Sequence, residues 1–235
     1  MGDWSVRRVT AALAVVGGVV ALVGNLLAPR FNDDDVVVYR KIADSGRFTV
    51  SGVVILLAVL LVTAAFVGIS RAWLGTRAGE LASYGRLAAV VGGTLAILQA
   101  GVALYGYKQQ AQAFADANTT NVVSAFWATN AVDHVNSALF ATWTIVFLGL
   151  APALLGAAQL RERMPAGRLG VAGIVGGAVC VIVGVGSLLT SDQSTYDVPF
   201  LIGSLLVTFW LIGTGVVMWR EPASVDGAAA AVATP

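Results

Sequence analysis

Residues 9–28 read VTAALAVVGGVVALVGNLLA, an apolar run without a charged side chain. A run of this length crosses about 30 Å of hydrocarbon as a helix. Arg7 and Arg8 precede it, as in a secretory signal peptide, but the run exceeds the roughly 7–15 residues of a signal core. We therefore expect an uncleaved first transmembrane helix that the two arginines anchor on the cytoplasmic side.

Five further apolar segments of spanning length follow. The six predicted spans cover residues 9–28, 50–70, 87–107, 132–158, 169–189 and 199–219. In lipid each span must be helical, because only a helix satisfies its backbone hydrogen bonds internally. The sequence predicts an all-α membrane protein, a bundle of six transmembrane helices over residues 1–220, followed by a disordered cytoplasmic tail over residues 221–235.

The composition excludes several other classes of protein. Charged residues make up 11% of the chain, whereas a soluble domain carries about 25%. The six spans use most of the 235 residues and leave no room for a separate soluble domain. The net charge of +1 and the absence of a basic patch give no reason to expect nucleic-acid binding. Cys180 is the single cysteine, so neither an intramolecular disulfide nor a thiolate metal cluster is expected.

The distribution of lysine and arginine predicts the orientation of the bundle. With both termini in the cytoplasm, nine of the fourteen basic residues lie inside, as the positive-inside rule requires. These nine are Arg7, Arg8, Arg71, Arg77, Arg86, Arg161, Arg163, Arg168 and Arg220. We therefore predict an N-in, C-in protein of the inner (plasma) membrane. The lipid bilayer is its expected partner.

The connections on the outer side are expected to be polar. Residues 29–48 carry three consecutive aspartates and are predicted to form a solvated loop, and residues 108–129 are predicted to form a second polar loop. Aromatic residues near the span ends, Tyr39, Tyr105, Tyr107 and Trp127 among them, fit an interfacial belt. The fourth segment is too long for a simple span, so its first two turns should protrude outward, and Pro152 should kink it.

Glycine pairs recur in the odd-numbered spans. The sequence Val-Gly-Gly occurs at residues 16–18, 91–93 and 175–177. Two explanations remain open. The bundle is built from three helix hairpins in series, or small residues recur because they let helix backbones approach closely. Exposed glycine faces are also compatible with a homo-oligomer.

The candidate site lies at the start of the fourth span. Asn130, Asp133, His134 and Ser137 fall on one face of a helix, next to Asn136. Asn25 and Gln99 lie at a compatible depth on the first and third spans. These polar groups predict either an outward-facing ligand pocket or a set of helix caps and interhelical hydrogen bonds.

Other chemistry has little support in the sequence. Asp133 and His134 are adjacent and point about 100° apart on a helix, so no metal site is expected. Ser187 follows Gly-Val-Gly but is followed by leucines, so it lacks the nucleophile elbow of a serine hydrolase. No charged residue is central in any predicted span, which leaves transport unsupported. No cofactor is predicted.

Several short motifs resemble a known family. The motifs are IADSGRF at residues 42–48, the fourth segment from Asp133-His134 to Phe147-Leu148-Gly149-Leu150, and PAGRLG at residues 165–170. They are similar to an uncharacterised family of bacterial six-helix integral membrane proteins, classed as a domain of unknown function. The resemblance implies a six-helix architecture and a bacterial inner membrane. It implies no activity, cofactor or catalytic residue.

The leading functional prediction is a non-enzymatic integral membrane protein. It would bind a small ligand, lipid or partner through its outer half, because the polar groups gather on that side. The alternatives are a membrane-embedded enzyme acting on a lipid or isoprenoid, with Asp133 and His134 as acid and base, and a small transporter.

Overall fold

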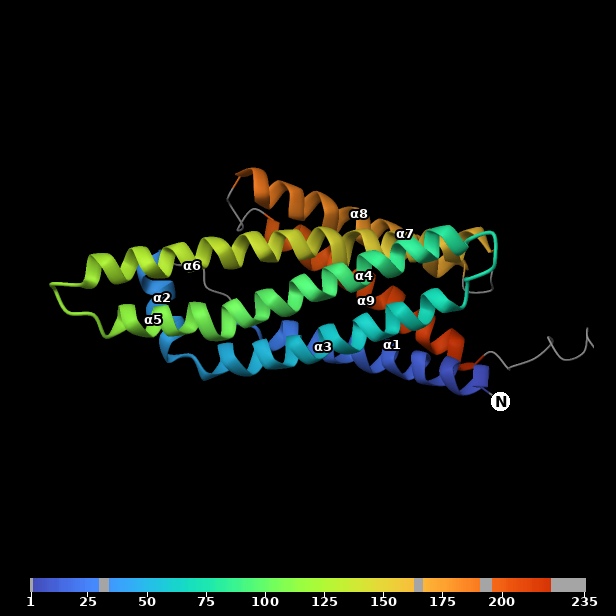
Figure 1. Ribbon diagram of the computed structural model, residues 1–235, viewed down its shortest axis with the longest axis horizontal. Coiled ribbons are helices and arrows are strands. Elements are labelled where there is room, and N and C mark those ends of the chain that lie inside the picture. The colour runs from blue at the N-terminus through green and yellow to red at the C-terminus, as the bar shows by residue number, and fades with distance from the viewer. Residues whose placement is uncertain (1, 30–33, 163–166, 191–195, 221–235) are drawn as a thin grey trace, which may run out of the picture.

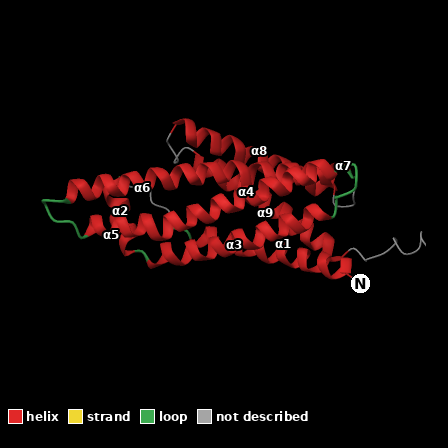
Figure 2. Ribbon diagram, in the orientation of Figure 1, coloured by secondary structure: helices red, strands yellow, loops and turns green. Residues whose placement is uncertain are grey.

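The computed structural model describes residues 2–29, 34–162, 167–190 and 196–220, and all regular structure in these ranges is helical (Figures 1 and 2). The predicted tail at residues 221–235 lies outside the described residues. The elements are α1 (Gly2–Leu27), α2 (Asp35–Asp44), α3 (Gly46–Arg71), α4 (Gly79–Gly101), a π-helical segment η1 (Val102–Tyr107), α5 (Lys108–Ala115), α6 (Val122–Trp143), a second π-helical segment η2 (Thr144–Leu150), α7 (Ala151–Arg161), α8 (Gly167–Thr190) and α9 (Asp197–Arg220).

Six helices are long and apolar enough to cross a membrane, which confirms the predicted all-α bundle of an integral membrane protein. Four of them have the length of one bilayer crossing: Ser5–Leu27, Gly46–Arg71, Gly167–Thr190 and Asp197–Arg220. The other two are continuous rods through α4, η1 and α5 (37 residues) and through α6, η2 and α7 (40 residues). Forty residues extend about 60 Å, twice the hydrocarbon thickness. The predicted third and fourth spans are therefore only parts of longer helices.

The predicted polar loop between the third and fourth spans is largely helical. Only residues 116–121 connect α5 to α6, and Figure 1 shows the two helices projecting as a hairpin beyond the ends of α8 and α9. Ala111 and Phe114 bury one face of α5, three residues apart. The Thr129 hydroxyl donates to the Gln110 carbonyl over 2.9 Å and ties the two helices together. The loop prediction failed because polar residues on the outer faces of these helices hide a short apolar stripe.

A second hydrophobic core lies beyond the membrane core, beside the α5–α6 hairpin. It joins α2 to the α5–α6 hairpin and is built on Tyr39, Ile42, Tyr107 and Phe114. Tyr39 is fully buried, and its ring packs edge-on against both Tyr107 and Phe114 with centroids 6.0 Å apart. Residues 35–44 are therefore a docked amphipathic helix and not the predicted solvated loop. Tyr39 and Tyr107 are core residues and not members of the interfacial belt, whereas Tyr105 is 70% exposed.

The six spans form a closed ring in which α1 packs on both α3 and α9. The membrane core is centred on Phe66, Phe147 and Trp210, which are at most 2% exposed. The Phe66 ring lies 5.5 Å from that of Phe147 and 5.8 Å from that of Trp210. The Trp210 indole N–H donates to the Gln159 side-chain oxygen over 2.8 Å, so this buried donor is satisfied.

The three Gly-Gly pairs repeat one packing arrangement. In each pair the first glycine faces the following span and the second faces the preceding span, with α9 preceding α1 in the ring. Gly17 faces α3 and Gly18 faces α9; Gly92 faces η2 and Gly93 faces α3; Gly176 faces α9 and Gly177 faces η2. A methyl group at any of the six would lie within 3.1 Å of a neighbouring helix. The pairs thus allow close helix packing at three equivalent points of the ring.

Pro152 lies two residues after the end of η2. A proline inside a helix has no N–H to donate and clashes with the carbonyl group four residues earlier. The wider π turn over Thr144–Leu150 accommodates this defect within a continuous helix.

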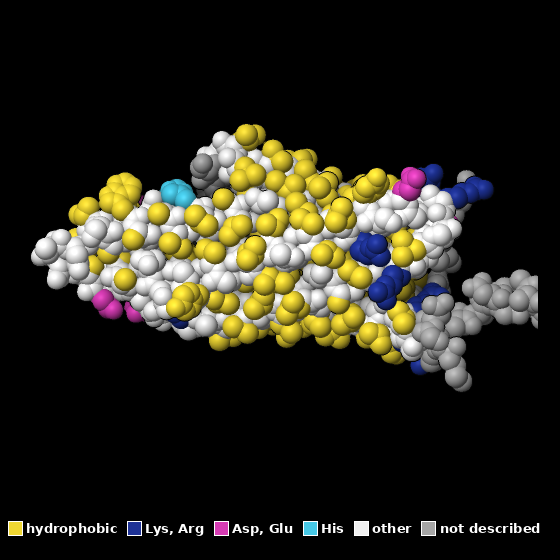
Figure 3. Space-filling model, in the orientation of Figure 1, with side chains coloured by type: hydrophobic (Ala, Val, Ile, Leu, Met, Phe, Trp, Pro, Cys, Tyr) yellow, Lys and Arg dark blue, Asp and Glu magenta, His cyan; other side chains and the backbone are white. Residues whose placement is uncertain are grey.

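Charged side chains divide the bundle into two unlike ends (Figure 3). Arginines gather near the N-terminus, at the end that we call the arginine end; it carries Arg7, Arg8, Arg71, Arg77, Arg86, Arg161, Arg168 and Arg220. The opposite end carries α2 and the α5–α6 hairpin, and we call it the hairpin end. His134 lies on this side with acidic side chains that include Asp35 and Asp133, whereas Glu80 and Glu162 lie at the arginine end.

Candidate functional site

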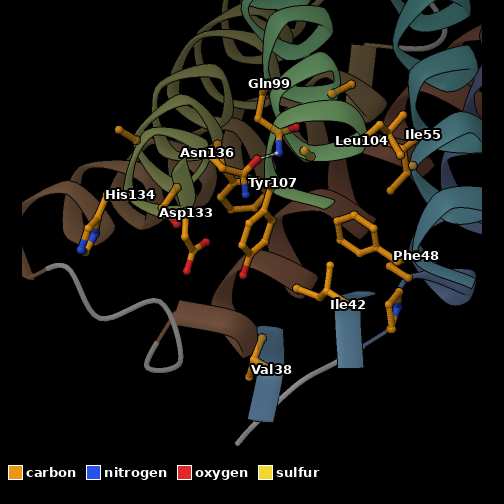
Figure 4. Close-up of a pocket in the computed structure, with 18 of the residues that line it drawn as sticks. Val38, Ile42, Phe48, Ile55, Gln99, Leu104, Tyr107, Asp133, His134 and Asn136 are labelled. Atoms are coloured by element: carbon orange, nitrogen blue, oxygen red, sulfur yellow. Dashed lines mark hydrogen bonds between the residues drawn. The ribbon is translucent and has the colours of Figure 1, made fainter. Parts of the chain in front are cut away.

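A partly open cavity of about 750 Å³ lies at the hairpin end, where the second core meets the bundle (Figure 4). Helices α2, α3 and α6, the segment α4–η1 and the ends of α1 and α8 contribute to its wall. Its polar lining consists of Asp35, Ser51, Gln99, Tyr107, Asn130, Asp133, His134, Asn136, Ser137 and Ser187. The volume lies within the range of small-molecule sites in proteins.

Asp133 is the half-buried carboxylate of this wall. The hydroxyls of Tyr107 and Tyr39 lie near its carboxylate, and Figure 4 shows Asp133 and Tyr107 pointing into the same space. Asn130 donates from its side-chain nitrogen to the Tyr39 hydroxyl oxygen over 3.2 Å. The Tyr39 proton is therefore left to point toward an acceptor such as Asp133. Asp133, Tyr107 and Asn130 line the cavity, and Asn130 links them to the buried Tyr39.

Burial raises the pKa of the Tyr39 hydroxyl above its ordinary value of 10.0. The Asn130 hydrogen bond opposes this effect by stabilising the phenolate, and the negative charges of Asp133 and Asp35 add to it. Tyr39 is therefore a neutral hydrogen-bond donor across the physiological pH range.

The π-helical segment η1 places Tyr107 in the cavity. Residues four apart on an α-helix drift by about 40° around its axis, so Gln99, Ala103 and Tyr107 would turn progressively away from one face. A π turn contains more residues per turn and cancels this drift. All three side chains accordingly line the same cavity.

Gln99 and Asn136 form the floor of the cavity. The Gln99 side-chain nitrogen donates to the Asn136 side-chain oxygen over 2.7 Å, which links α4 to α6 (Figure 4). This hydrogen bond satisfies two polar side chains at the depth where the apolar interior of the bundle begins.

An apolar pocket of about 190 Å³ continues beneath this floor. It shares Ile55, Gln99 and Phe140 with the 750 Å³ cavity, which we call the upper cavity. Its remaining wall includes Ala58, Val59, Val62, Trp143, Phe147, Leu148, Val207 and Leu211. Across the two spaces, the lining side chains change from polar at the partly open mouth to apolar in the interior.

The structure gathers the predicted site residues around these two spaces. Asn130, Asp133, Ser137 and Gln99 line the upper cavity together with His134. His134 is exposed and points away from Asp133 in Figure 4. The sixth residue, Asn25, lines the apolar pocket, and its amide nitrogen donates to the Ala21 carbonyl over 3.0 Å.

Sequence reasoning missed Tyr39 and Tyr107 as members of the site. The pattern Tyr39, Ile42, Ala43 has the three- and four-residue spacing of an amphipathic helix, and it could have predicted that α2 folds back on the bundle. The position of Tyr107 depends on the π turn, which no residue pattern in this stretch reveals. Within the described ranges, no three His, Cys, Asp or Glu side chains gather closely enough to hold a metal ion.

Comparison with known proteins finds no matching family model, no matching curated protein and no matching solved structure. The resemblance of the short motifs to a six-helix bacterial family therefore stays a prediction, and the functional argument rests on the geometry of the site.

Proposed function

We propose that this integral membrane protein is a non-enzymatic binding protein that holds a small ligand in the cavity at its hairpin end. The observation that carries the proposal is the 750 Å³ cavity with Asp133 on its wall and the hydroxyl groups of Tyr107 and Tyr39 around that carboxylate. Large cavities that combine an apolar lining with a few convergent polar groups are typical of ligand sites.

The charge of the wall favours a ligand with a cationic head. The charged lining residues are the acidic Asp35 and Asp133, and no lysine or arginine in the described part of the chain lines the cavity. Lys108 follows Tyr107 directly, but its ammonium group is bound to the Thr49 hydroxyl and lies 3.4 Å from the Ser45 carbonyl oxygen. Aromatic faces such as that of Phe48 also attract a cation.

We further propose that the hairpin end faces outward and that both termini are cytoplasmic, in a bacterial inner membrane. The supporting observation is the gathering of arginines at the opposite end of the bundle (Figure 3), which the positive-inside rule assigns to the cytoplasm. The ligand would then reach the cavity from outside the cell.

Two features favour binding over the alternative functions. A catalytic acid–base pair must converge on one substrate, but His134 points away from Asp133 (Figure 4). A transporter needs a path between the two sides of the membrane. Beneath the apolar pocket, the rings of Phe66, Phe147 and Trp210 pack against one another and close the arginine half of the bundle.

Thiol labelling tests the cavity and its orientation. A single cysteine at position 137, introduced by Ser137→Cys with Cys180→Ala, should react with a membrane-impermeant maleimide added outside intact cells. Excess tetramethylammonium, the probe for a cationic head, should slow the reaction. The added substitution Asp133→Asn should remove this protection.

The matched control is Val123→Cys in the same background, because Val123 is 66% exposed on the part of α6 that projects in the hairpin and does not line the cavity. Its labelling should not respond to tetramethylammonium. Labelling of position 137 only after the membrane is opened would reverse the proposed orientation. A rate that tetramethylammonium leaves unchanged would contradict the cationic ligand.

A further inference from the structure

The apolar pocket lies where α1 and α9 separate. At the arginine end these helices are in close contact: a methyl group at Gly215 would lie 2.9 Å from the Ala11 carbonyl oxygen, and one at Gly18 would lie 2.6 Å from Ile212. Past Gly18, toward the hairpin end, the pocket begins between the two helices. Ala21 and Asn25 on α1, and Ser204 and Phe200 on α9, line the pocket.

The pocket lies along the α1–α9 side of the ring. From Gly18 to Asn25 the pocket runs for about 10 Å along α1, within the bilayer-spanning part of that helix. Asn25 is exposed although it lines the pocket, whereas Gly18 at the point of contact is buried. On α9 the neighbouring Ile202 is 52% exposed on the outer surface of the ring. The pocket is thus bordered by residues that also border the acyl-chain region.

The pocket is closed below and adjoins the cavity above it. Phe147 and Leu211 belong both to its wall and to the packed membrane core. At the top, Gln99, Ile55 and Phe140 belong to both the pocket and the cavity that contains Asp133. An occupant that filled both spaces would have a polar end at Asp133 and an apolar end beside Phe147.

We infer that the ligand is a single-chain amphiphile with a cationic head, and that its apolar chain enters the pocket sideways from the bilayer between α1 and α9. The inference rests on the proposed function and adds the chain, its location and its route. Charge complementarity with Asp133 and Asp35 selects the head. The apolar walls stabilise the chain by about 0.8 kcal/mol for each buried methylene group.

Photo-crosslinking locates the chain directly. The probe is a dodecyltrimethylammonium ion with a diazirine at the end of its chain, added to the full-length protein in nanodiscs of phosphatidylglycerol, a lipid without an ammonium group. We expect crosslinks at Ala21, Ser204 and Val207 in the pocket, in preference to Ile182 and Ile202 on the lipid-facing surface. A dodecyl sulfate probe with the same diazirine should not show this preference.

Two substitutions that fill the pocket test the occupancy. Ser204→Phe and Ala21→Leu project into the pocket from opposite walls, and each should lower the pocket crosslinks of the cationic probe about tenfold, as the loss of two buried methylene groups would. Ile202→Phe, on the lipid-facing side of the same helix as Ser204, is the matched control and should leave them unchanged. Two independent fillers and the wild-type crosslink map keep the test valid if one variant folds poorly.

The outcomes separate the inference from the proposed function. Asp133→Asn should change the crosslink pattern of the cationic probe to that of the sulfate probe. Pocket crosslinks that survive this substitution would contradict the cationic head and with it the proposed function. Crosslinks spread evenly over lipid-facing residues would overturn the chain site alone if tetramethylammonium still protected position 137. A pocket signal that both fillers leave unchanged would overturn it as well.

Discussion

Gln99 on α4 donates a 2.7 Å hydrogen bond to Asn136 on α6, at the boundary between the polar cavity and the apolar pocket. The bond joins the two longest helices of the protein at one level. It also fixes the depth at which the polar lining ends, because the pocket below is almost wholly apolar. The pair therefore contributes both to the packing of the bundle and to the shape of the site.

Breaking this pair should destabilise the bundle modestly. We expect Gln99→Leu to lower the free energy of unfolding by about 1 kcal/mol, in keeping with interhelical hydrogen bonds measured in membranes. Asn136→Leu should cost a similar amount. The double variant should cost less than the sum, because each single variant leaves one amide without its partner. Unfolding by sodium dodecyl sulfate, followed by circular dichroism, measures all three; strictly additive losses would contradict the coupling.

The contact at Gly177 should tolerate no added methyl group. A Cβ atom there would lie 2.5 Å from the Gly149 carbonyl oxygen and 3.0 Å from the Ala153 methyl group, so two backbones must move apart. We expect Gly177→Ala to lower the free energy of unfolding by about 1–3 kcal/mol. Gly101→Ala is the matched control, because nothing lies within 4 Å of the added methyl group and alanine favours a helix. Equal melting temperatures for the two variants would refute the close-packing role of Gly177.

The membrane bundle could be predicted from the sequence because length and hydropathy dictate it. An apolar run such as residues 9–28 has one stable form in lipid. Five of the six predicted runs lie wholly within helices of the structure, and the run 9–28 extends one residue past the end of its helix at Leu27. The glycine pairs also carried information, since Gly92 and Gly177 lie where helix backbones approach closely. These features follow from local sequence and from the solvent alone.

The upper half of the site could be predicted only in part. The face shared by Asn130, Asp133 and Ser137 follows from helical periodicity, and it does line the cavity. The contribution of Tyr39 depends on how α2 docks, and that of Tyr107 depends on a π turn. Both are features outside the membrane core, where water can satisfy open backbone groups and the solvent no longer limits the backbone to one form.

The buried pair of Gln159 and Trp210 should be a large single contribution to stability. Gln159→Leu would leave the fully buried indole N–H of Trp210 without the acceptor that lies 2.8 Å away. An unsatisfied buried donor costs about 1–3 kcal/mol, so we expect a loss of that size in the free energy of unfolding. The double variant Gln159→Leu with Trp210→Phe removes donor and acceptor together, and its comparison with the two single variants gives the coupling energy. A coupling energy near zero would show that the hydrogen bond contributes nothing to stability.

Tyr39 should make the protein sensitive to alkali. Burial raises the pKa of its hydroxyl above 10.0, so in this range the folded state retains a proton that the unfolded state loses. Its contribution to stability is complete below pH 10.0 and is lost as the pH rises through the higher pKa of the folded state. We expect the melting temperature of the wild type to fall more steeply above this pH than that of Tyr39→Phe. Below pH 10.0, Tyr39→Phe should be the less stable protein by about 1 kcal/mol, because Asn130 loses its hydrogen-bond acceptor.

Tyr105→Phe is the control for the general effect of alkali, since Tyr105 is 70% exposed, and it should follow the wild type. Parallel curves for wild type and Tyr39→Phe across the whole range would mean that the Tyr39 hydroxyl titrates alike in the folded and unfolded states, which its burial between Tyr107 and Phe114 opposes.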